Sequence, residues 1–99
     1  MAQYDVHRLA NGHGLVIDCQ SDLLDHIGSR FVVPLLPVKL APPPITRLNP
    51  VFQVDGAGYV MLTQSAGAIR RRDLGPAVAS LADRHVEIVD AIDVLLSGV

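Results

Sequence analysis

The amino-acid sequence predicts a small, mainly β protein: a partly closed antiparallel barrel with one C-terminal helix. Short apolar segments alternate with turn-forming residues from the N-terminus to about residue 70, a pattern typical of short strands joined by tight turns. The period then changes, because Leu81, Ile88, Ile92 and Leu95 recur at helical spacing. Short strands in an open sheet leave edges free to pair with other chains, so we expect a closed barrel with the helix packed on it.

Two turn signals organise the strands. Asn11-Gly12 and Asp55-Gly56 each stand between apolar segments, and such dipeptides favour hairpin turns because both residues tolerate positive φ. Ser80, with Asp83 three residues later, is a candidate cap for the helix. The expected elements are strands at residues 3–9, 15–19, 31–38, 51–54, 59–63 and 64–69, and a helix from about residue 82 to 97.

Two segments depart from this simple pattern. Residues 22–28 are too short for an independent helix, so we expect a loop or single turn that either exposes or buries Leu23 and Leu24. Residues 31–38 are the most strand-prone segment, and their unbroken apolar character predicts burial on both faces. Pro34 and Pro37 cannot donate ladder hydrogen bonds, which predicts an edge strand or a bulge.

Composition limits the class of protein. We expect residues 1–99 to form one domain with a small core, for which dimerisation would add stability. The net charge of −2 argues against a broad nucleic-acid surface. The single cysteine, Cys19, excludes an intramolecular disulfide and a cysteine-rich zinc site. Neither an apolar run of about 20 residues nor a signal-peptide pattern is present, so we expect a cytoplasmic protein without membrane contact.

No arrangement of residues in the sequence suggests catalysis. The four histidines are scattered, and there is no nucleophile elbow, His-x-Glu motif or pair of carboxylates. No spacing favours a metal ion or a cofactor, so we expect neither. The residue pattern therefore favours binding over catalysis.

Two other features suggest contacts with other chains. Arg70, Arg71 and Arg72 form the only basic cluster, which fits a solvated loop or a docking site for an acidic segment better than a nucleic-acid site. Residues 95–99 end in an apolar stretch that packs either against the barrel or against another chain. With the two leucines of segment 22–28 they could form one functional patch.

Six short motifs follow one another in an order that matches a known family. They are Gln20–Asp25, Gly28-x-Arg30-x-Val32-Val33-Pro34-Leu35, Asn49–Val51, Tyr59-x-Met61-x-Thr63, Asp83-x-His85 in the terminal helix, and Leu96–Val99. In length, motif order and spacing the chain resembles the CcdB family of toxins from bacterial toxin–antitoxin modules. Residues 39–48 fit the family pattern poorly.

The resemblance implies a homodimer of small SH3-like barrels that acts by binding and is not an enzyme. Toxins of this family bind the A subunit of DNA gyrase at the two-fold axis of the dimer and trap the cleaved DNA–gyrase complex. The family pattern has Trp at the position of Ser97 and Asn at that of Asp93. The gyrase-binding positions that carry over are Leu23, Leu24, Asp93, Leu96, Ser97, Gly98 and Val99.

A CcdA-like antitoxin with a disordered tail is the other implied partner. We expect an acidic tail to dock beside the basic cluster or the first hairpin turn, which selects Asn11, Gly12, Arg70, Arg71 and Arg72. Two alternatives remain: a MazF- or Kid-like endoribonuclease on the same barrel, and a CcdB-like protein that no longer poisons gyrase. Fold alone does not separate these functions, and the lack of a basic groove favours binding without direct nucleic-acid contact.

Overall fold

The computed structural model describes residues 2–98 and confirms the mainly β fold class, with seven strands and one α-helix in that part of the chain. The strands are β1 (Asp5–Leu9), β2 (Leu15–Asp18), β3 (Ser29–Pro37), β4 (Val51–Val54), β5 (Ala57–Met61), β6 (Gly67–Arg70) and β7 (Leu74–Ser80), and the helix is α1 (His85–Ser97). Short 3-10 turns connect them: η1 (Asp22–Leu24), η2 (Val38–Leu40), η3 (Thr63–Ser65), η4 (Arg71–Asp73) and η5 (Ala82–Arg84).

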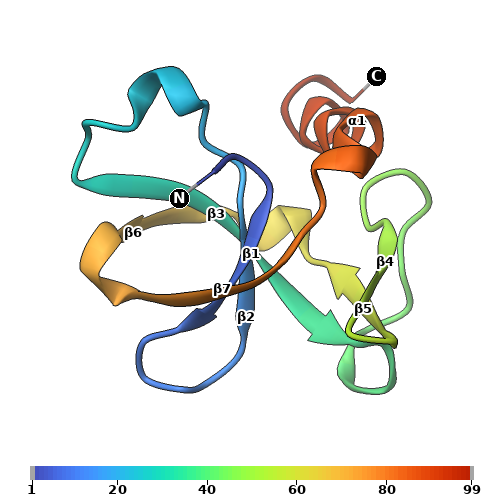
Figure 1. Ribbon diagram of the computed structural model, residues 1–99. Helices are drawn as coiled ribbons and strands as arrows, with labels where there is room; N and C mark the ends of the chain where they lie inside the picture. The colour runs from blue at the N-terminus through green and yellow to red at the C-terminus, as the bar shows by residue number, and fades with distance from the viewer. Residues whose placement is uncertain (1, 99) are drawn as a thin grey trace.

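The strands form one curled antiparallel sheet in the order β4-β5-β3-β2-β1-β7, and β6 pairs with β3 beside this path. Figure 1 shows that β4 and β5 lie on one side of the curled sheet, with the end of β3, while β6 and the beginning of β3 lie on the other. The helix α1 lies at the upper end of the same view, opposite the β1–β2 turn. The predicted partly closed barrel with a terminal helix is therefore confirmed.

Both predicted hairpins are present. The β1–β2 pair has Val6 opposite Ile17, and its turn contains Gly12 at a φ of 81°. The β4–β5 pair turns on Asp55 and Gly56, with φ angles of 52° and 80°. Positive φ at both central residues gives the turn the twist that two antiparallel strands need.

An edge strand or a bulge was expected at Pro34 and Pro37, and the edge strand is wrong because β3 lies inside the sheet between β2 and β5. Pro34 lies where the partner of β3 on one side changes from β6 to β5. Its carbonyl accepts the N–H of Leu62 on that side. The N–H and C=O of a strand residue point toward the same neighbouring strand. The N–H that Pro34 lacks would therefore face the gap between the ladders with β6 and β5. Pro37 is the last residue of the strand.

Burial of β3 on both faces was also expected, and it holds only in part. Val33 and Leu35 are buried in the main core, and Val32 is buried in a second, smaller cluster. Phe31 and Leu36 are only partly buried, so the strand is not covered evenly along its length. The sheet curls, and one helix cannot cover both of its faces.

Strand β7 was not anticipated from the sequence. Its composition, with Gly75 and Pro76 near its start, opposes a strand assignment. The structure explains the glycine, since a Cβ on Gly75 would lie 2.6 Å from the carbonyl oxygen of Arg8 on β1. The β1–β7 pairing also shifts register on both sides of His7. Close approach and irregular register are tertiary features that local propensity does not report.

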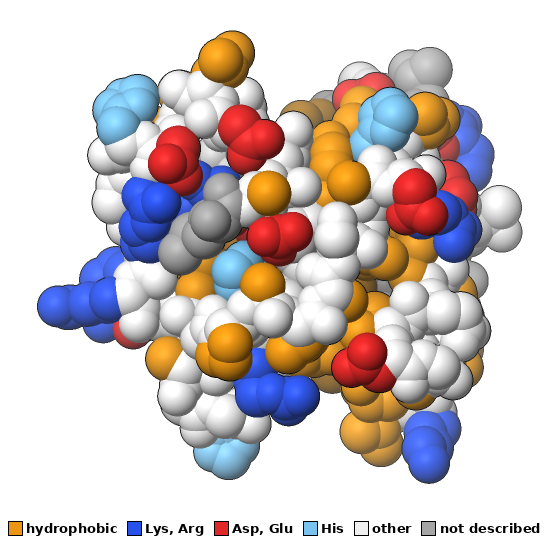
Figure 2. Space-filling view, in the orientation of Figure 1, with side chains coloured by type: hydrophobic (Ala, Val, Ile, Leu, Met, Phe, Trp, Pro, Cys, Tyr) orange, Lys and Arg blue, Asp and Glu red, His pale blue; other side chains and the backbone are white. Residues whose placement is uncertain are grey.

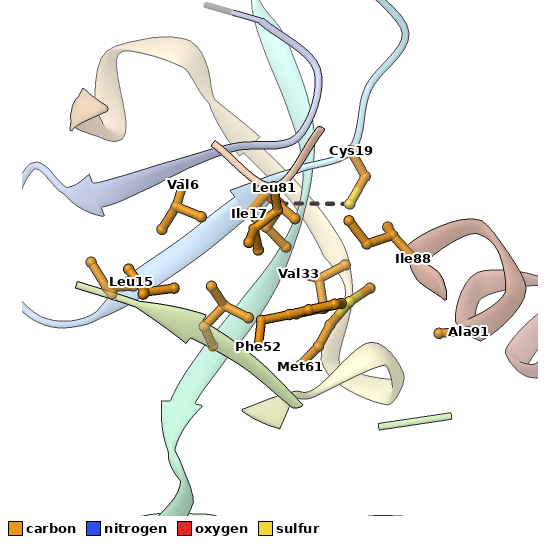
Figure 3. Close-up of a cluster of buried hydrophobic side chains, with 12 residues drawn as sticks. Val6, Leu15, Ile17, Cys19, Val33, Phe52, Met61, Leu81, Ile88 and Ala91 are labelled. Atoms are coloured by element: carbon orange, nitrogen blue, oxygen red, sulfur yellow. Dashed lines mark hydrogen bonds between the residues drawn. The ribbon is translucent and has the colours of Figure 1, made fainter. Parts of the chain in front are cut away.

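The helix packs on the barrel through a few fully buried side chains. Ile88 and Ala91 of α1 are fully buried, and Ile88 belongs to one core cluster with Val33, Phe52 and Met61 (Figure 3). The helix begins at His85, later than predicted, because the preceding turn η5 is a 3-10 turn. The expected capping box is absent: the hydroxyl of Ser80 accepts the N–H of Ala82 at 3.3 Å. No helix within residues 2–98 combines the length and the apolar character needed to cross a membrane.

Candidate partner-binding site

The C-terminal end of α1 presents an exposed tip. Leu96 is 77% exposed, and Asp93 and Ser97 are also exposed beside it. Gly98 ends the helix at a φ of 72°, and its N–H donates to the carbonyl of Val94 at 2.9 Å, which is the usual left-handed helix end. The tip therefore brings together four of the predicted gyrase-binding residues. Val99 lies outside the described residues.

The turn η1 presents the other predicted leucines. Leu23 is 88% exposed and Leu24 is partly exposed, so the loop displays them. The hydroxyl of Ser21 accepts the N–H of Leu23 at 3.2 Å and caps the turn. None of the three residues of η1 is buried. Figure 2 shows hydrophobic atoms at the outermost point of the lobe that η1 forms.

The two predicted parts of the site lie at the same end of the molecule but do not form one packed patch. Figure 1 shows η1 and α1 both at the upper end of the view. In the part of the chain that the structure describes, α1 packs against η3 and η5 and makes no comparable contact with η1. A single partner, or a second copy of the chain, would have to contact both η1 and the end of α1.

The outer face of α1 extends this surface beyond the residues that the sequence analysis selected. Val86 and Val89 are exposed, and they share a face with Asp93 and Leu96 because residues three, four and seven positions apart project on the same side of a helix. This apolar stripe with one carboxylate was detectable from the spacing. Val86 and Val89 were nevertheless not among the predicted site residues.

A network of charged side chains lies under η1. Arg30 and Asp18 are both fully buried, and Nη2 of Arg30 lies 2.7 Å from Oδ2 of Asp18. Nη1 of Arg30 lies 3.5 Å from Oδ1 of Asp25, just beyond η1. The same Asp25 oxygen lies 2.9 Å from Nη2 of Arg71. The sequence analysis selected Arg71 only as part of a basic cluster and missed this network, whose members are far apart in the chain.

The predicted antitoxin-binding residues are brought together. The N–H of Ala10, at the start of the first hairpin turn, donates to the carbonyl of Asp73 in η4 at 2.8 Å. Asn11 and Gly12 are exposed in that turn. Figure 2 shows Lys and Arg side chains gathered at the left edge of the molecule, where η4 lies, with carboxylates above them.

The three arginines of the basic cluster are not equivalent. Arg70 pairs with Asp73 at 3.2 Å, and Arg71 pairs with Asp25. Arg72 is exposed and has no ion-pair partner among residues 2–98. Within the described part of the chain, the cluster therefore offers one unpaired cation to an incoming acidic segment, and two that must exchange partners.

The other polar groups of residues 2–98 do not assemble a recognisable metal centre. No group of three or more His, Cys, Asp or Glu side chains within residues 2–98 has the geometry to hold a metal ion. Burial raises the pKa of the Cys19 thiol to about 12, which keeps it protonated and unreactive. A pocket of about 270 Å³ lies between residues 47–50 and α1, lined by Arg47, Pro50, Glu87 and Asp90.

Two solved structures are similar in fold to this chain. A mycobacterial endoribonuclease in complex with its cognate antitoxin has a TM-score of 0.76 at 14% sequence identity, covering 97% of this chain and 94% of that chain. A second mycobacterial endoribonuclease has a TM-score of 0.79 at 13% identity, covering 97% and 90%. At such low identity the likeness concerns the fold alone, and it shows that the first of these proteins carries a similar fold in a complex with its antitoxin.

The particular family follows from the sequence. The family model of the CcdB protein matches residues 3–98, and the chain belongs to the CcdB family of toxins from toxin–antitoxin modules.

One prediction is corrected by these comparisons. The resemblance implied that the chain is not an enzyme, whereas the two solved structures that share its fold are named endoribonucleases. The expectation was wrong because it rested on the resemblance and on the absence of a local catalytic motif. Acid–base groups of an active site often come from segments that are distant in sequence, which local motifs do not record.

Proposed function

We propose that this CcdB-family toxin binds the A subunit of DNA gyrase as a homodimer, near the two-fold axis, and poisons the enzyme. The observation that carries the proposal is the exposure of Leu23 and Leu96, two large apolar side chains displayed at one end of a small protein. Such display on a soluble domain is typical of an interaction site. The proposed gyrase-binding residues are Leu23, Leu24, Asp93, Leu96, Ser97, Gly98 and Val99.

The chemistry of the tip suggests how the contact would form. The hydroxyl of Ser97 donates to the carbonyl of Asp93 at 2.7 Å, so it is already satisfied and offers little to a partner. Apolar burial would then come from Leu96 and Leu23, and the carboxylate of Asp93 would select a basic group on the target. A homodimer would present two such tips and raise the contact area.

The test is a binding titration of the toxin with the gyrase A subunit, with DNA cleavage assayed in parallel. Leu96→Ala should weaken binding at least tenfold, on the scale of a lost anchor residue. The matched control is Leu40→Ala, because Leu40 is similarly exposed but lies on η2. Equal effects of both changes, or no binding by the unaltered toxin, would contradict the proposal.

Two variants of the C-terminal tip sharpen this test. Ser97→Trp should strengthen gyrase binding, because a large ring would add apolar contact. Deletion of Ser97, Gly98 and Val99 should abolish poisoning and leave folding intact, because none of the described residues among them is buried. Poisoning by the deleted toxin at the level of the full chain would exclude the tip from the site.

A cognate antitoxin is the second proposed partner, with the docking site at Asn11, Gly12, Arg70, Arg71 and Arg72. The Ala10–Asp73 hydrogen bond, which joins the hairpin turn to η4, supports one continuous site. The antitoxin bound to the mycobacterial endoribonuclease supports a partner of this kind. Replacing the three arginines with Ala should lower the affinity of the toxin for an acidic antitoxin peptide, and the loss should be largest at low salt. Unchanged affinity would remove the cluster from the interface.

The alternative function is endoribonuclease activity, which the named activity of the two similar structures favours. Incubating the purified toxin with RNA of mixed sequence separates it from gyrase poisoning. Site-specific RNA cleavage that persists after Leu96→Ala would favour the ribonuclease. Gyrase binding without accumulation of cleaved DNA would instead identify a CcdB-like protein that no longer poisons gyrase.

The proposed location follows from the proposed target. Gyrase poisoning requires the toxin to be in the cytoplasm.

A further inference from the structure

The segment around η1 displays its leucines without a hydrophobic anchor of its own. From Asp22 to Gly28 every residue is exposed. In α1, by contrast, the exposed apolar side chains are carried by a helix that also buries Ile88 and Ala91. The position of Leu23 and Leu24 must therefore be set by polar contacts.

Those contacts flank the two leucines. On the N-terminal side, the carboxylate of Asp22 accepts the backbone N–H of Gln3 at 2.8 Å. On the C-terminal side, Nη2 of Arg71 lies 2.9 Å from Oδ1 of Asp25, and Nη1 of Arg71 donates to the carbonyl of the same residue. The backbone N–H of Arg71 also donates to the carbonyl of Gly28 at 2.9 Å.

The Asp25 carboxylate is held from two directions. Its Oδ1 atom faces Arg71 on one side and Nη1 of Arg30, at 3.5 Å, on the other. Arg30 is fully buried and is fixed by two contacts to Oδ2 of Asp18, at 2.9 Å from Nε and 2.7 Å from Nη2. Arg30 thus connects Asp25 to a buried ion pair, and Arg71 connects the same carboxylate to η4, which is distant in sequence.

We propose that Arg71 is a positioning residue for the gyrase-binding surface: it holds the 22–28 segment in the shape that presents Leu23 and Leu24. The inference rests on the proposed gyrase-binding function. The side chain of Arg71 makes one ion pair and one hydrogen bond to a carbonyl, and both go to Asp25 of this loop. Without Arg71, the carboxylate of Asp25 retains only the longer contact to Arg30, and the loop samples conformations that do not fit the partner.

The expected kinetic signature differs from that of a lost contact. If only a fraction of the free toxin has the loop in the binding shape, the apparent affinity falls by that fraction, and the fall appears in the association rate. A residue that touches the partner, as proposed for Leu23, instead changes mainly the dissociation rate. The two roles are therefore separable in one binding experiment.

The experiment compares Arg71→Ala with Arg8→Ala, because Arg8 is an exposed arginine of β1 that belongs to neither proposed binding site. Both changes remove one positive charge, but only the first removes contacts to Asp25. Hydrogen exchange of the backbone amides at residues 22–28 is measured in the free toxin, and association and dissociation rates are measured with the gyrase A subunit. Arg71→Ala should speed loop exchange and slow association by about threefold to fivefold. The dissociation rate and the thermal midpoint of unfolding should change little, and Arg8→Ala should match the unaltered toxin.

The outcomes separate this inference from the function on which it rests. Unchanged loop exchange and unchanged association in Arg71→Ala, with normal binding by the unaltered toxin, would overturn the positioning role and leave gyrase binding standing. Equal slowing by Arg8→Ala would also overturn it, because the loss of any positive charge would then explain the effect. No gyrase binding by the unaltered toxin would overturn both.

Discussion

The helix α1 and the turn η1 display exposed leucines at the same end of the molecule, but they are anchored by different forces. Ile88 and Ala91 fix α1 by apolar burial in the main core. The turn η1 has no buried residue, and Asp22 and Asp25 fix it through hydrogen bonds and ion pairs. Apolar burial is cooperative and insensitive to salt, whereas exposed ion pairs are weak and are screened. We therefore expect a firm helix tip and an adjustable loop in one binding surface.

The largest effect should come from removing the buried charge under the loop. Arg30→Met leaves Asp18 buried without its partner, which should destabilise the fold by about 3–5 kcal/mol. Urea unfolding followed by far-UV circular dichroism measures this change. The double variant Arg30→Met, Asp18→Leu should recover much of the loss, because two apolar side chains leave no unpaired charge. A double variant as unstable as the single one would show that packing, and not charge, is decisive here.

The anchor of the helix should be the next most sensitive point. Ile88→Ala removes a fully buried side chain from the main core and should cost about 2–5 kcal/mol. Val86→Ala is the matched control on the same helix, since Val86 is exposed and its loss should stay within about 0.5 kcal/mol. Thermal unfolding of the three proteins provides the comparison. Similar losses for both would mean that the outer face of α1 is covered in solution.

Salt should separate the loop from the helix directly. Raising the salt concentration from about 0.05 M to 1 M shortens the range of electrostatic attraction to about 3 Å, which should loosen the exposed contact of Arg71 with Asp25. Hydrogen exchange at residues 22–28 should then rise by a small factor, while exchange within α1 should stay constant. Equal changes in both segments would mean that the loop is not held mainly by charge.

The smallest effect should come from the ion pair between Arg47 and Asp90. Hydrogen bonds from Arg47 hold the pKa of Asp90 below its usual 3.8. A depressed carboxyl pKa contributes stability that is present above 3.8 and is lost as the pH falls through the folded-state value. Arg47→Gln should return the pKa of Asp90 toward 3.8, as followed by NMR titration of the carboxyl carbon. Because α1 is anchored by its core residues, its hydrogen exchange at pH 7 should not change.

The local elements of the fold were readable from the sequence where one short-range rule decided them. Asp55-Gly56 requires a turn with positive φ, and residues 51–54 alternate correctly for a half-buried strand. The helix was detectable because its apolar residues repeat at helical spacing. The six motifs were sufficient to identify the CcdB family, which the family model confirms over residues 3–98.

Long-range proximity was decided only by the tertiary structure. Strand β7 forms although Gly75 and Pro76 oppose it, because pairing with β1 outweighs local propensity. Pro34 is accepted inside the sheet because one neighbouring strand ends and another begins beside it. Asp18, Asp25, Arg30 and Arg71 share a network because the barrel brings together segments that are up to 53 residues apart, from Asp18 to Arg71. Charge pairs and strand ladders depend on distance in space, and a sequence pattern records only distance along the chain.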